Sequence, residues 1–183
     1  MKKSLLASLL GLLAANASAQ LTITGVYDGP LPGGLPKGVE LYVSEDITDL
    51  SAYGLGSANN GGGSNGEEFV FPPEAITAGS YITVASEVDG FSEFFGFAPD
   101  YIAASAMSIN GDDAIELFYN GVVTDQFGEP DVDGTDQAWE YLDGWAYRKS
   151  GTNTAASFNV SDWQFSGANA LDGASDNASA ANA

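Results

Sequence analysis

Apolar and polar residues alternate with a period of two along most of the chain after residue 20. This is the pattern of β-strands that bury one face and expose the other. The alternating stretches are short, and they are separated by glycine, proline, asparagine and aspartate residues, which favour turns. The segments predicted as strands are 21–24, 39–43, 53–55, 68–71, 80–85, 113–119, 122–127 and one or two strands within 139–148.

Many short strands with little helix between them predict a β-sandwich or barrel, here an all-β domain over residues 20–166 with about seven to nine strands. The Asn-Gly pair at 120–121 lies between two apolar runs and predicts a two-residue hairpin turn. Segment 28–34 is dense in turn residues and predicts a loop, and the glycine-rich segment 59–66 predicts a flexible surface loop. The phenylalanine-rich segment 91–97 predicts an aromatic loop or a short helix.

The two ends of the chain differ from its body in composition. Lys2 and Lys3 precede an apolar run that ends in the small residues Ala-Ser-Ala at 17–19, which is the pattern of a secretory signal peptide over residues 1–19. We therefore expect secretion to the periplasm, the cell surface or the extracellular space. Residues 167–183 are mainly alanine, asparagine, serine, aspartate and glycine and predict a disordered tail. No later run approaches the about 18 apolar residues of a transmembrane helix, so none is expected.

The chain is strongly acidic, with 5 lysine and arginine residues against 25 aspartate and glutamate residues. Cleavage after Ala19 would remove Lys2 and Lys3, so the mature chain would carry 3 − 25 = −22 charges. A surface of this sign repels the phosphates of nucleic acids and anionic lipids, which argues against direct nucleic-acid binding. It attracts divalent cations and basic partners, and it also keeps a protein soluble in salty water without any ligand. Both interpretations stay open.

Histidine and cysteine are missing from the sequence. Without histidine the chain has no Ser-His-Asp triad, no Cys-His pair and no histidine-ligated zinc site. Without cysteine it has no disulfide, although an exported protein is free to form one. A catalytic function would therefore depend on carboxylates, with or without a metal.

Six segments occur in the order of the motifs of one known family. They are similar to its strand and turn motifs and cover 36–42, 49–53, 76–81, 110–117, 121–128 and 139–148. The segment Asn-Gly-Asp-Asp-Ala-Ile-Glu-Leu at 110–117, for example, is similar to an N-G-D-D-A-I-x-L strand. By these motifs the chain resembles a bacterial lamin tail domain over roughly residues 21–165. The insert at 59–66 and the phenylalanine-rich stretch at 91–97 depart from the family pattern.

The resemblance implies an immunoglobulin-like β-sandwich. Bacterial lamin tail domains are usually modules of secreted or surface proteins, often beside nucleases, phosphatases or other hydrolases, and they offer no catalytic residues to carry over. The resemblance thus implies a non-catalytic binding or structural module at the cell surface or in the extracellular matrix, or an accessory module to a secreted nuclease or phosphatase. Its partner would be an extracellular protein or polysaccharide of unknown identity. A small secreted hydrolase and self-assembly through edge strands are the alternatives.

Segment 125–140 is the best candidate for a metal site. Asp131, Asp133 and Asp136 stand around Gly134, and calcium requires several hard oxygen ligands and a tight turn. The spacing is not that of an EF-hand loop, because Gly134 comes too early. A solvated acidic turn is the alternative interpretation. The candidate ligands for Ca²⁺ are Asp125, Asp131, Asp133, Asp136 and Glu140.

Four aromatic residues recur with a period of two near the C-terminal end of the domain. They are Trp139, Tyr141, Trp145 and Tyr147. If no bulge falls at the Asp-Gly pair at 143–144, they line one face of a strand. An exposed row of this kind is typical of a sugar-stacking or protein-binding surface, whereas a buried row belongs to the core. Aromatic residues of a sandwich are more often core residues.

Overall fold

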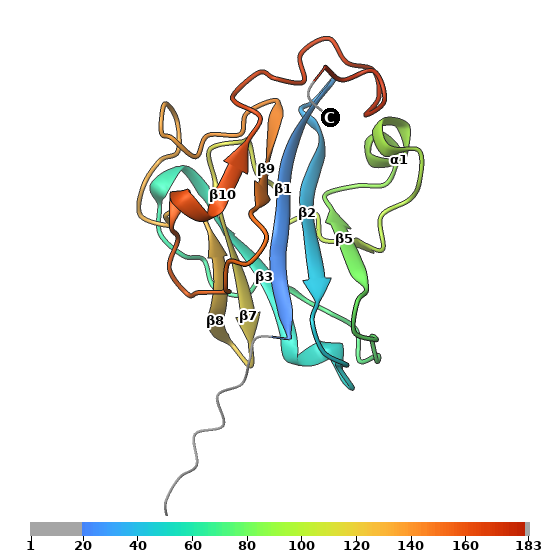
Figure 1. Ribbon diagram of the computed structural model, residues 1–183, viewed down its shortest axis with the longest axis vertical. Helices are drawn as coiled ribbons and strands as arrows, with labels where there is room; N and C mark the ends of the chain where they lie inside the picture. The colour runs from blue at the N-terminus through green and yellow to red at the C-terminus, as the bar shows by residue number, and fades with distance from the viewer. Residues whose placement is uncertain (1–19, 182–183) are drawn as a thin grey trace, which may run out of the picture.

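The computed structural model describes residues 20–181, and the predicted signal peptide over 1–19 lies outside this range. The described chain forms two facing β-sheets with one α-helix, α1 (Asp89–Phe95), beside them (Figure 1). This confirms the prediction of an all-β, sandwich-like fold with little helix. Over residues 20–181, no helix has the length and apolar character that a membrane span requires.

The larger sheet contains six strands in the order β10-β9-β1-β2-β5-β6. Neighbouring strands are antiparallel except β5 and β6, which are parallel. Its strands are β1 (Leu21–Leu31), β2 (Leu35–Val43), β5 (Tyr81–Ala85), β6 (Tyr101–Ile102), β9 (Gly144–Arg148) and β10 (Trp163–Phe165).

The smaller sheet contains four antiparallel strands in the order β4-β3-β7-β8. Its strands are β3 (Tyr53–Ala58), β4 (Phe69–Val70), β7 (Ala114–Tyr119) and β8 (Val122–Phe127). The described chain has ten strands, more than predicted, because the short strands β6 and β10 were not among the predicted segments. Three short 3-10 helices complete the secondary structure, at Leu50–Ala52, Asn59–Gly61 and Val160–Asp162.

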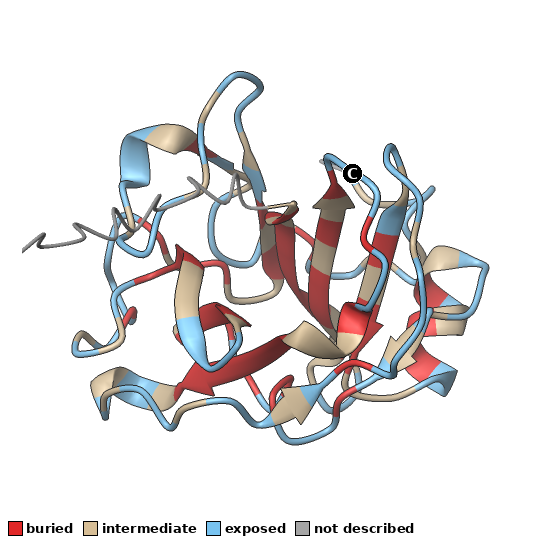
Figure 2. Cartoon of the chain, turned by 90° about the horizontal axis from the view of Figure 1, so that it is seen from below, coloured by how far each residue is buried: buried red, intermediate tan, exposed pale blue. Residues whose placement is uncertain are grey.

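The core lies between the two sheets, and Figure 2 shows buried residues concentrated along the strands while most loops are exposed. The alternation in β2 places Val39, Leu41 and Val43 in this core, as their period predicts. At the end of β8, Phe127 is fully buried among other aromatic rings. The rings within 6.0 Å of it, centre to centre, are those of Trp139, Tyr141, Phe158 and Trp163.

Two segments differ from the strand prediction. The predicted loop at 28–34 is mostly strand, because β1 runs to Leu31 and β2 begins at Leu35, which leaves 32–34 as the turn. Pairing of the two long strands holds these residues extended in spite of their local turn preference. Within 139–148, only Gly144–Arg148 forms a strand, and the residues before it form a turn.

The C-terminal segment 167–181 runs from β10 across the top of the sandwich to α1 (Figure 1). Here Leu171 is buried, and the Asn177 N–H donates a hydrogen bond to the Phe94 carbonyl oxygen at 2.8 Å. This course differs from the disordered tail that composition predicts. The segment has too few apolar residues to form a core of its own. It is held on the sandwich by one buried leucine and a few backbone hydrogen bonds.

Candidate functional site

Outward-facing residues of four strands form the floor of a pocket on the larger sheet. They are Tyr27 of β1, Glu40 of β2, Thr83 of β5, and Trp145 and Tyr147 of β9. Tyr27 pairs with Trp145 across β1 and β9, and Glu40 pairs with Thr83 across β2 and β5. Because strand neighbours directly opposite each other point to the same face, the register alone brings these side chains together.

Two glycines give the rings of this floor their space. Gly25 lies between Glu40 and Tyr147 in the ladder, and a Cβ atom at Gly25 would lie 3.0 Å from Cε1 of Tyr147. A Cβ atom at Gly38 would lie only 2.4 Å from Oη of Tyr27. Because positions 25 and 38 carry no side chains, the two tyrosine rings can occupy the space above them.

Helix α1 provides an aromatic wall. The Glu87 carboxylate accepts hydrogen bonds from the N–H groups of Gly90 at 2.8 Å and Phe91 at 3.1 Å, and so satisfies two donors that the start of a helix leaves free. The spacing of Phe91, Phe94 and Phe95 places all three rings on the helix side that faces the sheet. Of the two predicted alternatives for 91–97, an aromatic loop or a short helix, the structure has the helix, which ends at Phe95.

The pocket has a volume of about 260 Å³. The first hairpin closes one side with Gly29 and Pro36, and the C-terminal segment closes another with Leu171 and Asn177. Phe97 stands at the rim, with 54% of its surface exposed. Since pockets for drug-sized ligands start at about 300 Å³, this one suits a small molecule or a single head group.

The aromatic rings of the pocket are steeply inclined to one another. The Tyr27 and Phe95 rings lie 5.3 Å apart at 73°, and the Trp145 and Tyr147 rings lie 5.4 Å apart at 63°. Such edge-to-face pairs are favourable for the rings themselves. A group that enters the pocket therefore meets rings in several orientations instead of one flat platform.

Of the described residues that line the pocket, Glu40 alone is charged. Its Oε1 accepts a hydrogen bond from Oγ1 of Thr24 at 2.7 Å, which holds the carboxylate over the floor. Burial raises the pKa of Tyr147, and the nearby Glu40 charge raises it further. Burial also raises the pKa of Tyr27, with smaller contributions from Tyr147, Glu40 and Glu87. Both phenols are therefore neutral at physiological pH.

A buried ion pair lies in the hairpin beside the pocket. Lys37 Nζ donates to Asp28 Oδ1 at 2.7 Å. Burial raises the pKa of Asp28 to about 6, although the Lys37 ammonium group lowers it in opposition. Lys37 is thus paired with Asp28 and does not serve as a counter-ion for Glu40.

The structure separates Asp125 from the other predicted calcium ligands. Asp125 is fully buried, and both of its carboxylate oxygens lie 2.8 Å from Nη2 of Arg148. It also accepts hydrogen bonds from the N–H groups of Ile23 and Ala155. Burial raises the pKa of Asp125 and Arg148 lowers it in opposition. Asp125 thus forms a buried ion pair with the guanidinium group of Arg148.

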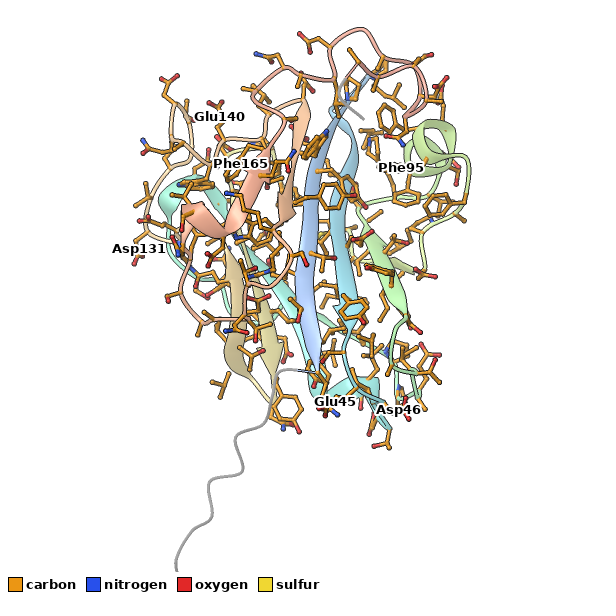
Figure 3. All side chains as sticks on the ribbon, in the orientation of Figure 1. Glu45, Asp46, Phe95, Asp131, Glu140 and Phe165 are labelled. Atoms are coloured by element: carbon orange, nitrogen blue, oxygen red, sulfur yellow. The ribbon has the colours of Figure 1, made fainter. Side chains whose placement is uncertain are left out.

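Two of the remaining predicted ligands, Asp133 and Glu140, make local hydrogen bonds. Asp133 accepts from the Thr135 N–H at 2.9 Å, and Glu140 accepts from the Asp136 N–H at 3.0 Å. Figure 3 shows Asp131 and Glu140 at separate points on the side of the molecule away from Phe95 of the aromatic pocket. Within the described part of the chain, no three acidic side chains come together as a metal would need.

Thermal unfolding distinguishes a calcium site in segment 125–140 from the alternative, a solvated acidic turn. At fixed ionic strength, we expect millimolar calcium and magnesium to raise the melting temperature of the purified chain by the same small amount, because both screen a net charge of −20. A calcium-specific rise would contradict this. A site filled to 100 times its Kd adds about 2.7 kcal/mol, and Asp131→Ala or Asp133→Ala would abolish that gain.

The four aromatic residues of the predicted row belong to two different surfaces. Trp139 and Tyr141 are buried in the core, where the Tyr141 hydroxyl donates to the Asp113 carbonyl oxygen at 3.0 Å. Trp145 and Tyr147 face the other side of the larger sheet and line the pocket, with Tyr147 45% exposed. The turn before β9 separates the pairs, so the condition for one continuous face, an uninterrupted strand through 143–144, is not met.

Other pocket residues were not recognised in the sequence. Glu40 and Tyr27 look like ordinary outward positions of amphipathic strands, and only the strand register shows that they share a site. The available signal was the cluster of four phenylalanines at 91–97, too many for a solvated loop.

Comparisons with known proteins add no relative to this picture. No family model, no curated protein and no solved structure matched the chain.

Proposed function

We propose that this chain is a secreted, non-catalytic binding module of the cell surface or the extracellular matrix, and that it holds its ligand in the aromatic pocket. The observation that carries the proposal is the pocket itself. It lies on the outer face of a sheet, and such a face ordinarily exposes polar residues. This pocket is instead lined by seven aromatic side chains: Tyr27, Phe91, Phe94, Phe95, Phe97, Trp145 and Tyr147.

The rigidity of the floor supports a binding role. Four strands of one sheet fix the positions of the floor residues, and a site on strands is held more precisely than a site on loops. Four of the rings, Phe95, Phe97, Trp145 and Tyr147, keep part of their surface accessible. Their exposure costs free energy that a ligand would recover by covering them.

The resemblance to bacterial lamin tail domains supports the same proposal, since those domains serve as binding or positioning modules without catalysis. An accessory role beside a secreted nuclease or phosphatase fits the same site, because the pocket would then hold the enzyme's target or anchor. A stand-alone binding module and an accessory module would both act by binding a ligand in the aromatic pocket.

The chemistry of the lining favours binding over hydrolysis. Hydrolysis of a glycoside by carboxylates needs two acidic groups about 5–10 Å apart on opposite sides of the reacting bond. Glu40 is the single carboxylate among the described lining residues, and it already accepts a hydrogen bond from Thr24. Turnover of p-nitrophenyl glycosides, esters or phosphates by the purified chain would overturn the proposal in favour of a hydrolase.

Amide and aromatic NMR spectra test the proposal directly. We expect at least one of three small probes (benzyl alcohol, methyl β-glucoside or benzyltrimethylammonium) to shift the signals of Trp145, Tyr147 and Phe95 in a saturable way. Trp139 and Trp163 are buried elsewhere and serve as internal controls. Absence of saturable shifts with all three probes, or shifts scattered over the whole surface, would contradict binding in the pocket.

A further inference from the structure

We infer that the aromatic pocket binds an organic ammonium ion, with a trimethylammonium head group as the chemistry that fits it best. This inference rests on the proposed function, because it names the ligand class of the same site. It is carried by three features of the pocket: the arrangement of the rings, the position of Glu40 and the mainly aromatic lining.

The ring planes of the pocket are inclined to one another and do not form one flat platform. Tyr27 and Phe95 meet at 73°, Trp145 and Tyr147 meet at 63°, and Phe95 and Phe97 meet at 43°. A flat sugar or aromatic ligand stacks on one plane and leaves steeply inclined rings uncovered. A compact trimethylammonium group contacts rings in all these orientations, and each ring face attracts the positive charge through its quadrupole.

The charge of the pocket has the sign that such a ligand needs. Glu40 is the only charged side chain among the described lining residues. The three basic residues of the described chain are engaged elsewhere: Lys37 with Asp28, Arg148 with Asp125, and Lys149 with the Ser161 carbonyl oxygen at 2.9 Å. Among the described residues no ion pair engages the Glu40 carboxylate, so it can balance a ligand cation while it accepts the Thr24 hydrogen bond. The acidic net charge of the chain also attracts cations.

Two hydroxyl groups of the lining are already engaged within the protein and are not open to a sugar. Thr83 already donates its hydroxyl to Asp100 at 2.9 Å, and Tyr27 directs its hydroxyl to the Val84 carbonyl oxygen at 3.4 Å. A sugar hydroxyl buried without a partner costs free energy, whereas methylated ammonium groups have no N–H to satisfy. This difference favours an ammonium ion over a polysaccharide as the ligand.

The test compares choline with 3,3-dimethylbutan-1-ol, which has the same shape and no charge. Both are titrated into the purified chain at low ionic strength, and the saturable shifts of Trp145 and Tyr147 give the two Kd values. We expect choline to bind at least about tenfold more tightly than the neutral analogue, since cation–π contacts and the carboxylate act only on the charged ligand.

Two matched pairs of variants locate the effect. Glu40→Gln keeps an oxygen for the Thr24 hydroxyl but removes the charge, and we expect it to reduce the ratio of the two Kd values several-fold. Glu45→Gln removes the same charge from the loop after β2, which does not line the pocket and lies away from Phe95 (Figure 3), and should leave the ratio unchanged. Tyr147→Leu should also lower the ratio, whereas Tyr81→Leu, at an exposed tyrosine outside the pocket, should not.

Each outcome has a distinct meaning. Equal binding of choline and the neutral analogue would overturn the ammonium inference and leave the binding proposal standing. Failure of both, together with failure of the earlier three probes, would overturn the inference and the binding proposal. A loss of selectivity as large in Glu45→Gln as in Glu40→Gln would also overturn the inference, because the net charge and not the pocket would then be responsible.

The same head group occurs free and in lipids, and a further arm of the experiment distinguishes these sources. The chain is mixed with phosphatidylcholine vesicles and sedimented. Co-sedimentation that free choline displaces would support the inference with a lipid head group as the ligand. Choline binding without co-sedimentation would support it with a free ammonium ion, which the size of about 260 Å³ admits whole.

Discussion

Replacing Arg148 by methionine is expected to lower the free energy of unfolding by about 3–5 kcal/mol, because the substitution leaves Asp125 as an unpaired carboxylate in the core. The Arg148 and Asp125 side chains are 6% and 0% exposed, respectively. Arg148 also donates from Nε to the Ile23 carbonyl oxygen at 2.7 Å and lies 4.5 Å above the centre of the Trp163 ring. Urea denaturation of both proteins measures the loss.

The pH dependence of this loss identifies its cause. Burial already raises the pKa of Asp125, and removal of the guanidinium group raises it further. A raised carboxyl pKa means that stability is present at low pH and is lost as the pH rises through that pKa. The difference between Arg148→Met and the wild type should therefore shrink as the pH falls toward 4. A difference independent of pH would show that lost packing, and not the charge, is responsible.

Two further variants control for the loss of one positive charge and for the unpaired Asp125 carboxylate. Lys149→Met removes the same charge from an exposed neighbour and should cost less than about 1 kcal/mol. Adding Asp125→Asn to Arg148→Met removes the buried charge while keeping an oxygen for the Ile23 N–H, and should recover about 1 kcal/mol or more. No recovery in the double variant would contradict the ion-pair explanation.

Replacing Phe127 by alanine is expected to cost about 3–5 kcal/mol, since it opens a cavity where the two sheets meet the turns before β9 and β10. Phe127 is fully buried, and the Trp163 ring lies 4.8 Å from its own, centre to centre. The Trp139 and Tyr141 rings pack edge-on against it at 6.0 and 5.2 Å. Urea denaturation measures the cost, and Trp139 and Trp163 fluorescence reports whether the cluster reorganises.

Phe97→Ala provides the matched control. It removes the same side chain from the pocket rim, where Phe97 is 54% exposed, and should cost less than about 1 kcal/mol. Equal losses in the two variants would mean that the inner cluster is no more important to the fold than the rim of the pocket. A large loss confined to Phe127→Ala would place the main core between the sheets.

The alternation of apolar residues was sufficient to predict the fold class and much of the core. Val39, Leu41 and Val43 alternate with outward residues, and each is fully buried as that period requires. The hairpin at 120–121 also follows from its own two residues, since β7 and β8 meet there. Local patterns of this kind are visible in a sequence because the residues that produce them are neighbours along the chain.

The ion pair of Asp125 shows why the candidate metal site was harder to predict. In the sequence, Asp125 precedes an acidic segment and looks like one more ligand of it. In the fold, Ile23, Arg148 and Ala155 approach Asp125 from other parts of the chain and engage both of its oxygens. The partner of a buried charge depends on which strands pack together, and no local pattern contains that information.

The sequence by itself determined an all-β chain of short strands, an acidic surface and the exclusion of histidine- and cysteine-dependent chemistry. The tertiary structure alone decided where Trp145 and Tyr147 separate from Trp139 and Tyr141, and that Glu40 and the 91–97 phenylalanines join them in one pocket. Periodicity assigns each side chain to a face of its strand. Only the register between strands and the packing of α1 decide which side chains on that face meet, because those contacts join residues far apart in the chain.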